Sequence, residues 1–354
     1  MSATDLAERR RAGTVKMGYC VPAFAMPGPD LFRVPNVARI EDVDVLGNAR
    51  EAERLGFDSL WVCDHMILGR DKAVLEGWTT LAMIAGATQR AQLGLIHQAN
   101  LFRLPQIAAK MMATLDHLSG GRFIHFFEAG MGRAEQVAYG LDWDDDHAAR
   151  VERLEEAIAL IRALYTASGP IDFAGRFYRL EQAELAPKPR QAHVPIWLGE
   201  AFDPVIELTA RIADGWNTTP VTLAELDRRV GLLDAALGRA GRSRAELEIS
   251  LETQILVAPD IAALRRKVSA IVDRAAGTGA APCKPELLDF VAGRADLLPA
   301  EMTGPWIIGT AEDARRRIAE LRTRGVDHLM LWFMDAPDTD GMAYFMEEVA
   351  PGFR

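Results

Sequence analysis

Short apolar segments alternate with longer amphipathic segments along nearly the whole chain. The apolar segments are rich in branched and aromatic residues, as buried strands are, and the longer segments repeat apolar residues at helical spacing. Such alternation predicts a parallel sheet covered by helices. About eight units within 354 residues favour a closed (β/α)8 barrel over an open doubly wound sheet. The predicted strands cover residues 15–21, 57–63, 91–96, 123–127, 196–198, 214–217, 247–257 and 328–333.

The stretch from Arg103 to Met131 shows one unit clearly, as a helix, a tight turn and a strand. Pro105 suits the first turn of a helix, where its missing N–H needs no partner. Residues 119–121 (Ser-Gly-Gly) tolerate a positive φ and predict the end of that helix. The strand that follows ends at Glu128. A carboxylate at the tip of an apolar strand costs energy unless it is paired, and barrel enzymes carry their chemistry at the carboxyl ends of the strands.

The composition narrows the class of protein. A formal net charge of −10 argues against a nucleic-acid partner. No apolar run approaches the roughly 20 residues of a membrane helix, and the polar first residues hold no signal-peptide core, so we expect no membrane partner and a cytoplasmic enzyme. Cys20, Cys63 and Cys283 match no metal-binding spacing, and the acidic run at 142–146 suits a solvated helix start, so no metal site is expected.

The chain shows no internal repeat, linker or low-complexity tract. We therefore expect a single domain over residues 1–354. Residues 277–303 are rich in Gly and Pro and are predicted to be an insertion with one small helix. Together with residues 22–24, this insertion is expected to cover the site as a lid.

Five passages are similar to one known family, in the family's own order. They are residues 52–66, 103–131, 175–201, 210–218 and 307–333. On these passages the chain resembles the luciferase-like monooxygenase superfamily, which includes bacterial luciferase, alkanesulfonate monooxygenases and deazaflavin (F420)-dependent oxidoreductases. The resemblance implies a TIM barrel with an insertion before the last strand, and a reduced flavin or F420 bound at the carboxyl ends of the strands.

The resemblance also implies an activity. Residues 77–95 and 330–337 look more like the two-component monooxygenases, in which a separate flavin reductase supplies reduced FMN. The first expectation is therefore a monooxygenase that uses reduced FMN, through a peroxyflavin, on a small organic substrate. The Asp64-His65 pair also occurs in the F420 branch, so an F420-dependent oxidoreductase that transfers hydride is an alternative. A barrel that has lost its cofactor and acts as a binding protein is another. Family members are usually oligomers, and a homodimer is expected.

Two histidines at predicted strand tips are catalytic candidates. His65 follows the second strand, and its imidazole titrates near neutral pH, as a proton carrier requires. The alternative is a histidine that only bonds a neighbouring loop. His97 follows the third strand, where the resemblance implies a bulge, often with a non-proline cis peptide, behind the flavin ring. The alternative there is a plain strand end.

Glu128 is the third catalytic candidate. The resembling family commonly has a small residue in its place, and a small or polar residue in place of Phe126. Strand alternation puts Phe126 and Glu128 on one face. If that face is the barrel interior, Phe126 narrows the pocket, and Glu128 donates a proton or binds a cationic or hydroxylated substrate. The alternative is an ion pair with Arg103, Arg133 or Arg150.

The resemblance also implies which residues hold the cofactor. Leu95 and Ile96 lie at the bulge, and residues 199–201 lie where the family seats the flavin phosphate. A carboxylate there repels a phosphate, so the Glu200 side chain is expected to point away, and Arg150 to supply the missing charge. The expected cofactor-binding residues are Leu95, Ile96, Gln98, Ala129, Gly130, Tyr139, Arg150, Gly199, Glu200 and Ala201.

Overall fold

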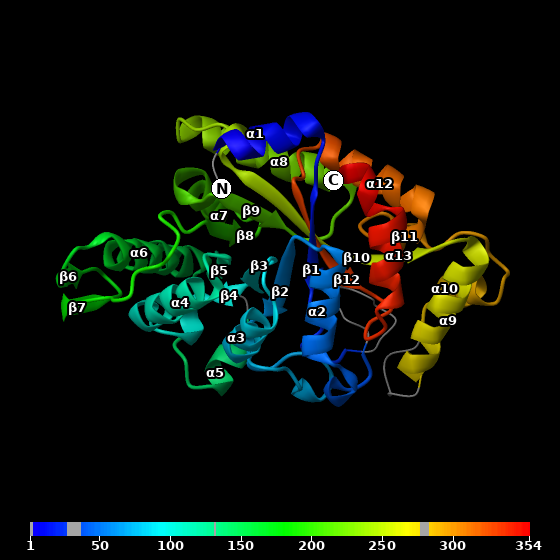
Figure 1. Ribbon diagram of the computed structural model, residues 1–354, viewed down its shortest axis with the longest axis horizontal. Coiled ribbons are helices and arrows are strands. Elements are labelled where there is room, and N and C mark those ends of the chain that lie inside the picture. The colour runs from blue at the N-terminus through cyan, green and yellow to red at the C-terminus, as the bar shows by residue number, and fades with distance from the viewer. Residues whose placement is uncertain (1–2, 27–36, 131, 277–282) are drawn as a thin grey trace.

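The structure is a computed structural model that describes residues 3–26, 37–130, 132–276 and 283–354. Eight parallel strands close into a barrel, which confirms the predicted (β/α)8 fold (Figure 1). The ring closes where β9 pairs with β10, with Gly215 opposite Glu248. In order around the barrel the strands are β1 (Lys16–Cys20), β2 (Ser59–Cys63), β3 (Gln92–Ile96), β5 (Phe123–Glu128), β8 (Ile196–Gly199), β9 (Gly215–Thr218), β10 (Glu248–Ala258) and β12 (His328–Phe333).

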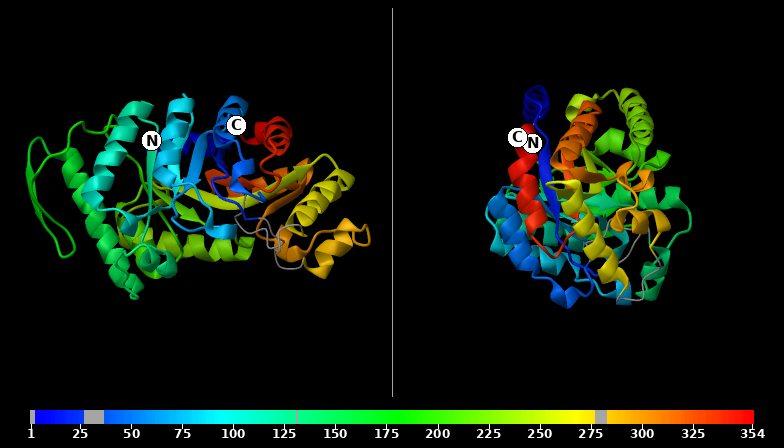
Figure 2. Two further views of the ribbon diagram at one scale, coloured as in Figure 1. Left: turned by 90° about the horizontal axis from the view of Figure 1, so that it is seen from below. Right: turned by 90° about the vertical axis from the view of Figure 1, so that its right-hand side faces the viewer.

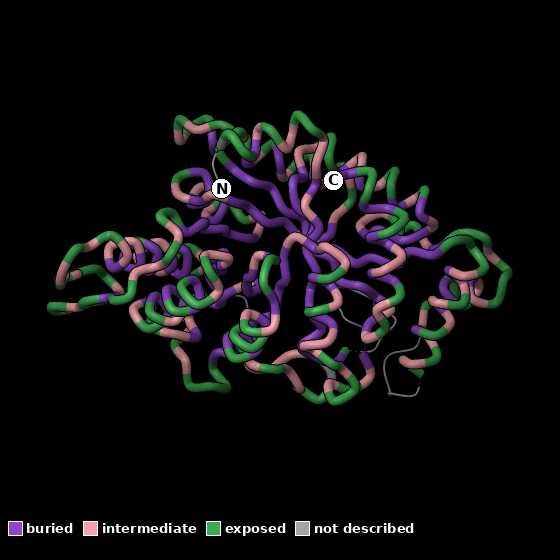
Figure 3. The backbone as a smooth tube through the Cα atoms, viewed as in Figure 1, coloured by how far each residue is buried: buried purple, intermediate pink, exposed green. Residues whose placement is uncertain are grey.

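Helices surround the barrel, and their ends follow the sequence signals. The Asp44 side chain accepts a hydrogen bond from the Gly47 N–H as the N-cap of α2, and Gly56 ends that helix at φ 95°. Gly120 ends α4 in the same way, at φ 80°. Figure 3 shows the barrel strands buried along their length and the surrounding helices exposed on one side. The surrounding helices are α2 (Val45–Leu55), α3 (Gly77–Ala87), α4 (Pro105–Ser119), α6 (His147–Thr166), α7 (Asp203–Ile212), α8 (Leu223–Arg239), α12 (Ala311–Thr323) and α13 (Asp340–Glu348).

The insertion before the last strand lies between β10 and β12, as predicted. The amino half of β10 belongs to the barrel, whereas from Ile255 onward it also pairs with β11 (Ile307–Thr310). Within residues 277–303 the structure has two short helices instead of the one predicted, and residues 277–282 lie outside the described part. The insertion projects at one end of the molecule, and the hairpin of β6 (Ile171–Ala174) and β7 (Arg179–Ala183) projects at the other (Figure 2). The helices between β10 and β11 are α9 (Ile261–Ala276), α10 (Pro285–Val291) and α11 (Ala300–Thr303).

Some elements were not predicted. Helix α1 (Ala3–Ala12) is polar, and it docks through Arg10, whose guanidinium bonds Asp327 and two backbone carbonyls below the barrel. Helix α5 (Arg133–Ala138) follows β5, and β4 (Gln98–Ala99) adds a short pairing to β5. The single-turn helices are η1 (Ile40–Asp42), η2 (Arg70–Lys72), η3 (Asn100–Phe102), η4 (Arg244–Glu246) and η5 (Ala350–Phe353).

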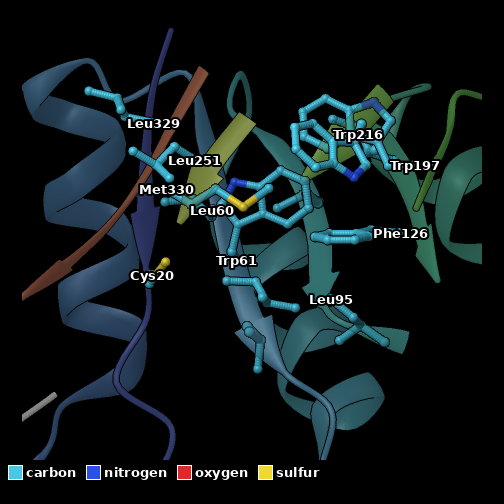
Figure 4. Packing of buried hydrophobic residues seen from close by; sticks show 14 of the residues in the cluster. Cys20, Leu60, Trp61, Leu95, Phe126, Trp197, Trp216, Leu251, Leu329 and Met330 are labelled. Atoms are coloured by element: carbon cyan, nitrogen blue, oxygen red, sulfur yellow. The ribbon is translucent and has the colours of Figure 1, made fainter. Parts of the chain in front are cut away.

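Aromatic side chains fill the barrel interior. The Trp61 and Trp197 rings lie 5.5 Å apart, and Phe126 packs its edge against Trp61 at 6.1 Å (Figure 4). Gly94 and Gly215 make room for the indoles, since a Cβ atom on either glycine would overlap a tryptophan ring. This packing confirms that Phe126 faces the interior. The described chain contains no helix long and apolar enough to span a membrane.

Candidate active site

The catalytic candidates lie where the barrel strands end. His97 follows β3 and Glu128 ends β5, and Nδ1 of His97 lies 3.4 Å from Oε2 of Glu128. The Ile96–His97 peptide bond is cis, at the place where the family resemblance puts the bulge. Beneath the imidazole lies the ring of Phe126, edge-on at 4.4 Å. Phe126 therefore forms the floor of this mouth, with His97 and Glu128 above it.

Glu128 pairs with His97 rather than with an arginine. Arg103 bonds other carboxylates, Arg133 lies 3.3 Å from Asp145, and Arg150 donates to a backbone carbonyl. The ion pairs considered for Glu128 are therefore not formed among the described residues. Its carboxylate remains part of the mouth, where it is 8% exposed.

His65, after β2, is bound to a carboxylate from α5. Its Nδ1 lies 3.0 Å from Oε2 of Glu135, and the other carboxylate oxygen accepts the N–H groups of Met66 and Ile67. Burial alone would lower the pKa of His65, but the hydrogen bond with Glu135 and the charge of Glu128 together raise it. The three catalytic candidates follow or end β2, β3 and β5, which are neighbours in the barrel. The sequence reasoning missed Glu135 because it missed α5.

A buried ion pair fixes the loops beside His65. Asp64 is 1% exposed, and Arg103 donates to both of its oxygens at 2.8 and 3.0 Å. Arg103 also donates to Glu76 at 2.6 Å, and Asp64 accepts the Ala99 N–H at 3.3 Å. The loops after β2 and β3 are thereby tied together, which holds His65 and His97 in place.

Glu200, after β8, has a φ of +87°, which is rare for a residue with a side chain. Its side chain is 6% exposed, and His147 Nε2 lies 3.2 Å from Oε2. Burial and the charge of Glu128 raise the pKa of Glu200 to about 8, against the lowering effect of Arg150. It is Gly199 that faces the mouth, since a Cβ atom on that glycine would lie 3.1 Å from the Phe126 ring and 3.4 Å from the His97 ring. That the Glu200 side chain points away from a bound phosphate stays a prediction.

The other expected cofactor residues fall into two groups. Tyr139 is 55% exposed and donates to the Met66 carbonyl at 3.3 Å. Arg150 donates to the Asp144 carbonyl at 2.6 Å and lies 4.2 Å over the Trp143 ring. In the structure these two side chains hold mouth loops. The remaining expected residues lie at or beside the ends of β3, β5 and β8; they are Leu95, Ile96, Gln98, Ala129, Gly130, Gly199 and Ala201.

Strand β10 contributes polar groups that the sequence reasoning missed. Glu252 accepts the Trp332 indole N–H at 2.7 Å and lies 3.8 Å from Nε2 of His97. Gln254 is on the same face by alternation, and within the described chain its buried amide has no partner. The available signal was the polar residue at every second position of an otherwise apolar strand, which is typical of a barrel-lining strand. The described residues hold no cluster suited to a metal ion.

The sequence profile of the luciferase-like monooxygenase family matches residues 38–328. This chain belongs to that family. An F420-dependent glucose-6-phosphate dehydrogenase from Microbacterium testaceum is 31% identical over 217 residues, which are 59% of this chain and 62% of that protein. One from Beutenbergia cavernae is 30% identical over 326 residues, or 88% of this chain and 93% of that protein. The chain thus spans less than two thirds of the first relative and nearly all of the second.

Solved structures agree on the fold of this luciferase-like chain. An F420-dependent secondary alcohol dehydrogenase in complex with an F420-acetone adduct superposes with a TM-score of 0.72 at 22% identity, over 96% of this chain and 99% of that chain. The monooxygenase RslO1 from Streptomyces bottropensis gives 0.73 at 22% identity, over 96% and 100%. The predicted family is confirmed.

Proposed function

We propose that the protein is an F420-dependent oxidoreductase that exchanges hydride with a small organic substrate. The observation that carries this proposal is the full-length similarity to the Beutenbergia cavernae protein, which is named as F420-dependent. His65 supports it, because the resemblance puts a histidine of the F420 branch at the redox centre. This proposal ranks the F420-dependent alternative ahead of the FMN-dependent monooxygenase, which the sequence alone favoured.

The residues at the mouth fit a ring of this kind. Deazaflavin and flavin rings both carry a pyrimidine edge of carbonyl and N–H groups. Several buried polar side chains near the strand ends have an atom without a hydrogen-bond partner among the described residues, and such an edge can satisfy them. Gln98, Asn100 and Gln254 are among them. Phosphate would lie at residues 199–201, beside the amino end of α7, which has no side-chain cap.

When bound, F420 supplies or accepts the hydride, and the chain does the rest. The aromatic floor at Phe126 closes the mouth to water from below. His65 keeps its proton to higher pH than a free imidazole, so it can stabilise negative charge on a substrate oxygen. The Asp64–Arg103 ion pair holds the loops that carry His65 and His97 in fixed positions.

We do not propose glucose 6-phosphate as the substrate of this protein, although the similar dehydrogenases are named for it. The mouth holds Glu128 and Glu252 beside His97, and carboxylates at this point disfavour a phosphate group on the substrate. We propose a neutral alcohol or carbonyl compound instead. Addition of glucose 6-phosphate and F420 to the protein is expected to give no reduction of F420, and rapid reduction would contradict this choice.

A reduced-FMN monooxygenase is the second candidate. It is favoured by the full-length superposition on RslO1 and by an aromatic mouth that suits an apolar substrate. It requires a separate flavin reductase as partner. A binding protein without cofactor is the third candidate, because Phe126, Glu128 and Glu200 occupy positions that are small or neutral in the resembling family.

Assembly, domain organisation and location are part of the same proposal. Exposed apolar side chains lie on or just before the neighbouring helices α3 and α4, and they suit a homodimer interface. They include Met83 in α3, Leu104 directly before α4, and Ile107 and Leu118 in α4. We keep a single domain with residues 277–303 as a lid, and a cytoplasmic enzyme. Light scattering tests the dimer, and limited proteolysis with and without cofactor tests the lid.

Calorimetric titration separates the three candidates. The purified protein is titrated with F420, FMN and, without oxygen, reduced FMN. We expect F420 to bind and Gln254→Leu to weaken it, whereas Gln182→Leu in the exposed β7 hairpin leaves it unchanged. Binding of reduced FMN without F420 binding would overturn the first candidate in favour of the second. Binding of none of the three ligands would favour the third.

A further inference from the structure

A cavity lies outside the barrel, between the insertion and α12. Its volume is about 410 Å³, and ligand pockets typically have about 300–1,000 Å³. The walls come from the start of α9, from α10 and α11, from β11 and from one face of α12. Strand β11 pairs with β10 outside the ring of barrel strands. The cavity is therefore separate from the mouth, and its described lining includes none of the three catalytic candidates.

The walls of the cavity are largely apolar. The insertion has an apolar core of its own, apart from the core of the barrel. Phe290, Leu298 and Ile308 belong to this core and also line the cavity. Leu297 lines the cavity as well and is exposed, so the cavity opens to solvent on that side. An apolar molecule that enters there would bury its surface against the insertion core.

Two N–H groups of the lining have no acceptor within the described chain. They are Nε1 of Trp306 and Nε of Arg317. Trp306 is 7% exposed and the Arg317 side chain 12%, so water reaches neither group freely. Buried donors are normally hydrogen-bonded. A ligand that brings an acceptor oxygen into the cavity would satisfy them.

The positive charge of Arg317 is only partly balanced. Its Nη2 donates to the backbone carbonyls of Gly304 and Val221, which carry no net charge. The carboxylate of Glu320 lies 3.7 Å from Nη1, and its side chain is partly exposed. Burial lowers the pKa of Arg317 against the raising effect of Glu320, as expected for a guanidinium that is removed from water without a close anion.

The two remaining acidic residues of the lining already have partners. Asp313 bonds Arg316 and caps the start of α12. Asp296 lies 3.6 Å from Arg265, and its side chain projects into solvent. The interior of the cavity therefore offers unpaired donors and a cation, which favours an anionic ligand over a cationic one.

We propose that this cavity is a second binding site, and that it takes a small apolar molecule with one carboxylate group. The apolar part lies against the insertion core, and the carboxylate accepts hydrogen bonds from Trp306 and Arg317. Such a ligand touches α10, α11 and α12 together, so it would fasten the insertion to the barrel. The inference goes beyond the proposed function and does not depend on F420.

The first test compares ligands of opposite charge. The protein without cofactor is titrated in a calorimeter with octanoate, with 3-phenylpropionate and with octylammonium, which has the chain of octanoate and a positive charge. We expect both carboxylates to bind with a Kd of about 1 mM or lower and to raise the melting temperature. Octylammonium is expected to do neither. Equal binding of octanoate and octylammonium, or no binding of either carboxylate, would overturn the proposal.

The second test places the bound carboxylate. Arg317→Met is expected to weaken octanoate binding by about 10-fold or more, because a charge-assisted hydrogen bond is lost. Trp306→Phe keeps an aromatic ring in the wall and removes only the N–H, so a loss of about 3-fold or more is expected. Arg315→Met, on the exposed side of the same helix, is the matched control and binds octanoate as the wild type does. Circular dichroism checks that each variant is folded.

A variant of the barrel mouth separates the two sites. Gln254→Leu is expected to bind octanoate with the affinity of the wild type. If Gln254→Leu loses affinity and Arg317→Met does not, octanoate binds in the mouth and the proposal is overturned. If Arg317→Met is unfolded, Trp306→Phe decides, and an unchanged affinity of that variant overturns the proposal. A failure of F420 to bind overturns the proposed function alone, since octanoate is measured without cofactor.

Discussion

Replacement of Arg103 by methionine tests the electrostatic support of the site. Arg103→Met keeps an apolar stem but removes both hydrogen bonds to Asp64, whose side chain then retains, from the described part of the chain, only the long bond from the Ala99 N–H. Loss of one partner from a buried ion pair typically costs about 3–5 kcal/mol. Asp64 is 1% exposed and the Arg103 side chain 12%, so solvent screening does not reduce this figure. We expect a loss of about 3 kcal/mol in the free energy of unfolding at about pH 8.

The same variant has a characteristic pH dependence. Burial already raises the pKa of Asp64 against the opposing effect of Arg103, and without Arg103 the pKa rises further. The folded variant then holds a proton that the unfolded chain releases, so its deficit shrinks as the pH falls. Urea unfolding at about pH 5 and about pH 8 measures both values, with Arg133→Met at an exposed pair as control. A deficit below about 1 kcal/mol at the higher pH, or one independent of pH, would refute the reasoning.

Three further predictions follow from other contacts. In Glu135→Gln the pKa of His65 falls, as followed by NMR titration, because the hydrogen bond and charge of Glu135 raise it; an unchanged value would contradict the assigned contact. Arg10→Met loses about 3 kcal/mol in urea unfolding, since Asp327 is left buried without its guanidinium, and a wild-type midpoint would contradict this. Burial lowers the pKa of His125 to about 3, so the folded chain excludes a proton that the unfolded chain binds. His125→Phe should therefore gain melting temperature relative to the wild type as the pH falls below about 6.5, and a constant difference would argue against it.

Most of the barrel was predictable because its units are local. Most strands of a parallel barrel are buried on both sides and are largely apolar, and helices such as α2 and α4 end at a glycine that permits a turn. The stretch from Pro105 to Glu128 shows this, since its proline, glycines and apolar run fix a helix, a turn and a strand without reference to distant residues.

Elements that depend on distant partners were missed. Among the described side chains of helix α1, Leu6 is the one apolar side chain that is buried. The helix docks through a hydrogen bond from Arg10 to Asp327, which lies more than 300 residues away in the sequence. The first residues show no periodic pattern that would indicate such a contact. The same holds for α5, whose role is to bring Glu135 to His65.

The sequence predicted the site residues that lie at the ends of strands, but not those that lie within a strand. His97 and Glu128 end adjacent units of the barrel, and the structure brings them together. Glu252 and Gln254 lie within β10, where the sequence shows an apolar strand with occasional polar residues. Their importance depends on which face of β10 lines the barrel, and that face is set by closure against β9 and β12.

The tryptophans inside the barrel give the protein a built-in optical signal. Trp61, Trp197 and Trp216 are almost completely shielded from water, and the first two rings are near enough to exchange excitation. Native emission is therefore expected at the blue end of the indole range, with a shift to the red when the barrel opens. A chromophore that settles above Phe126 would quench the same light, so loading of the mouth can be followed without any label.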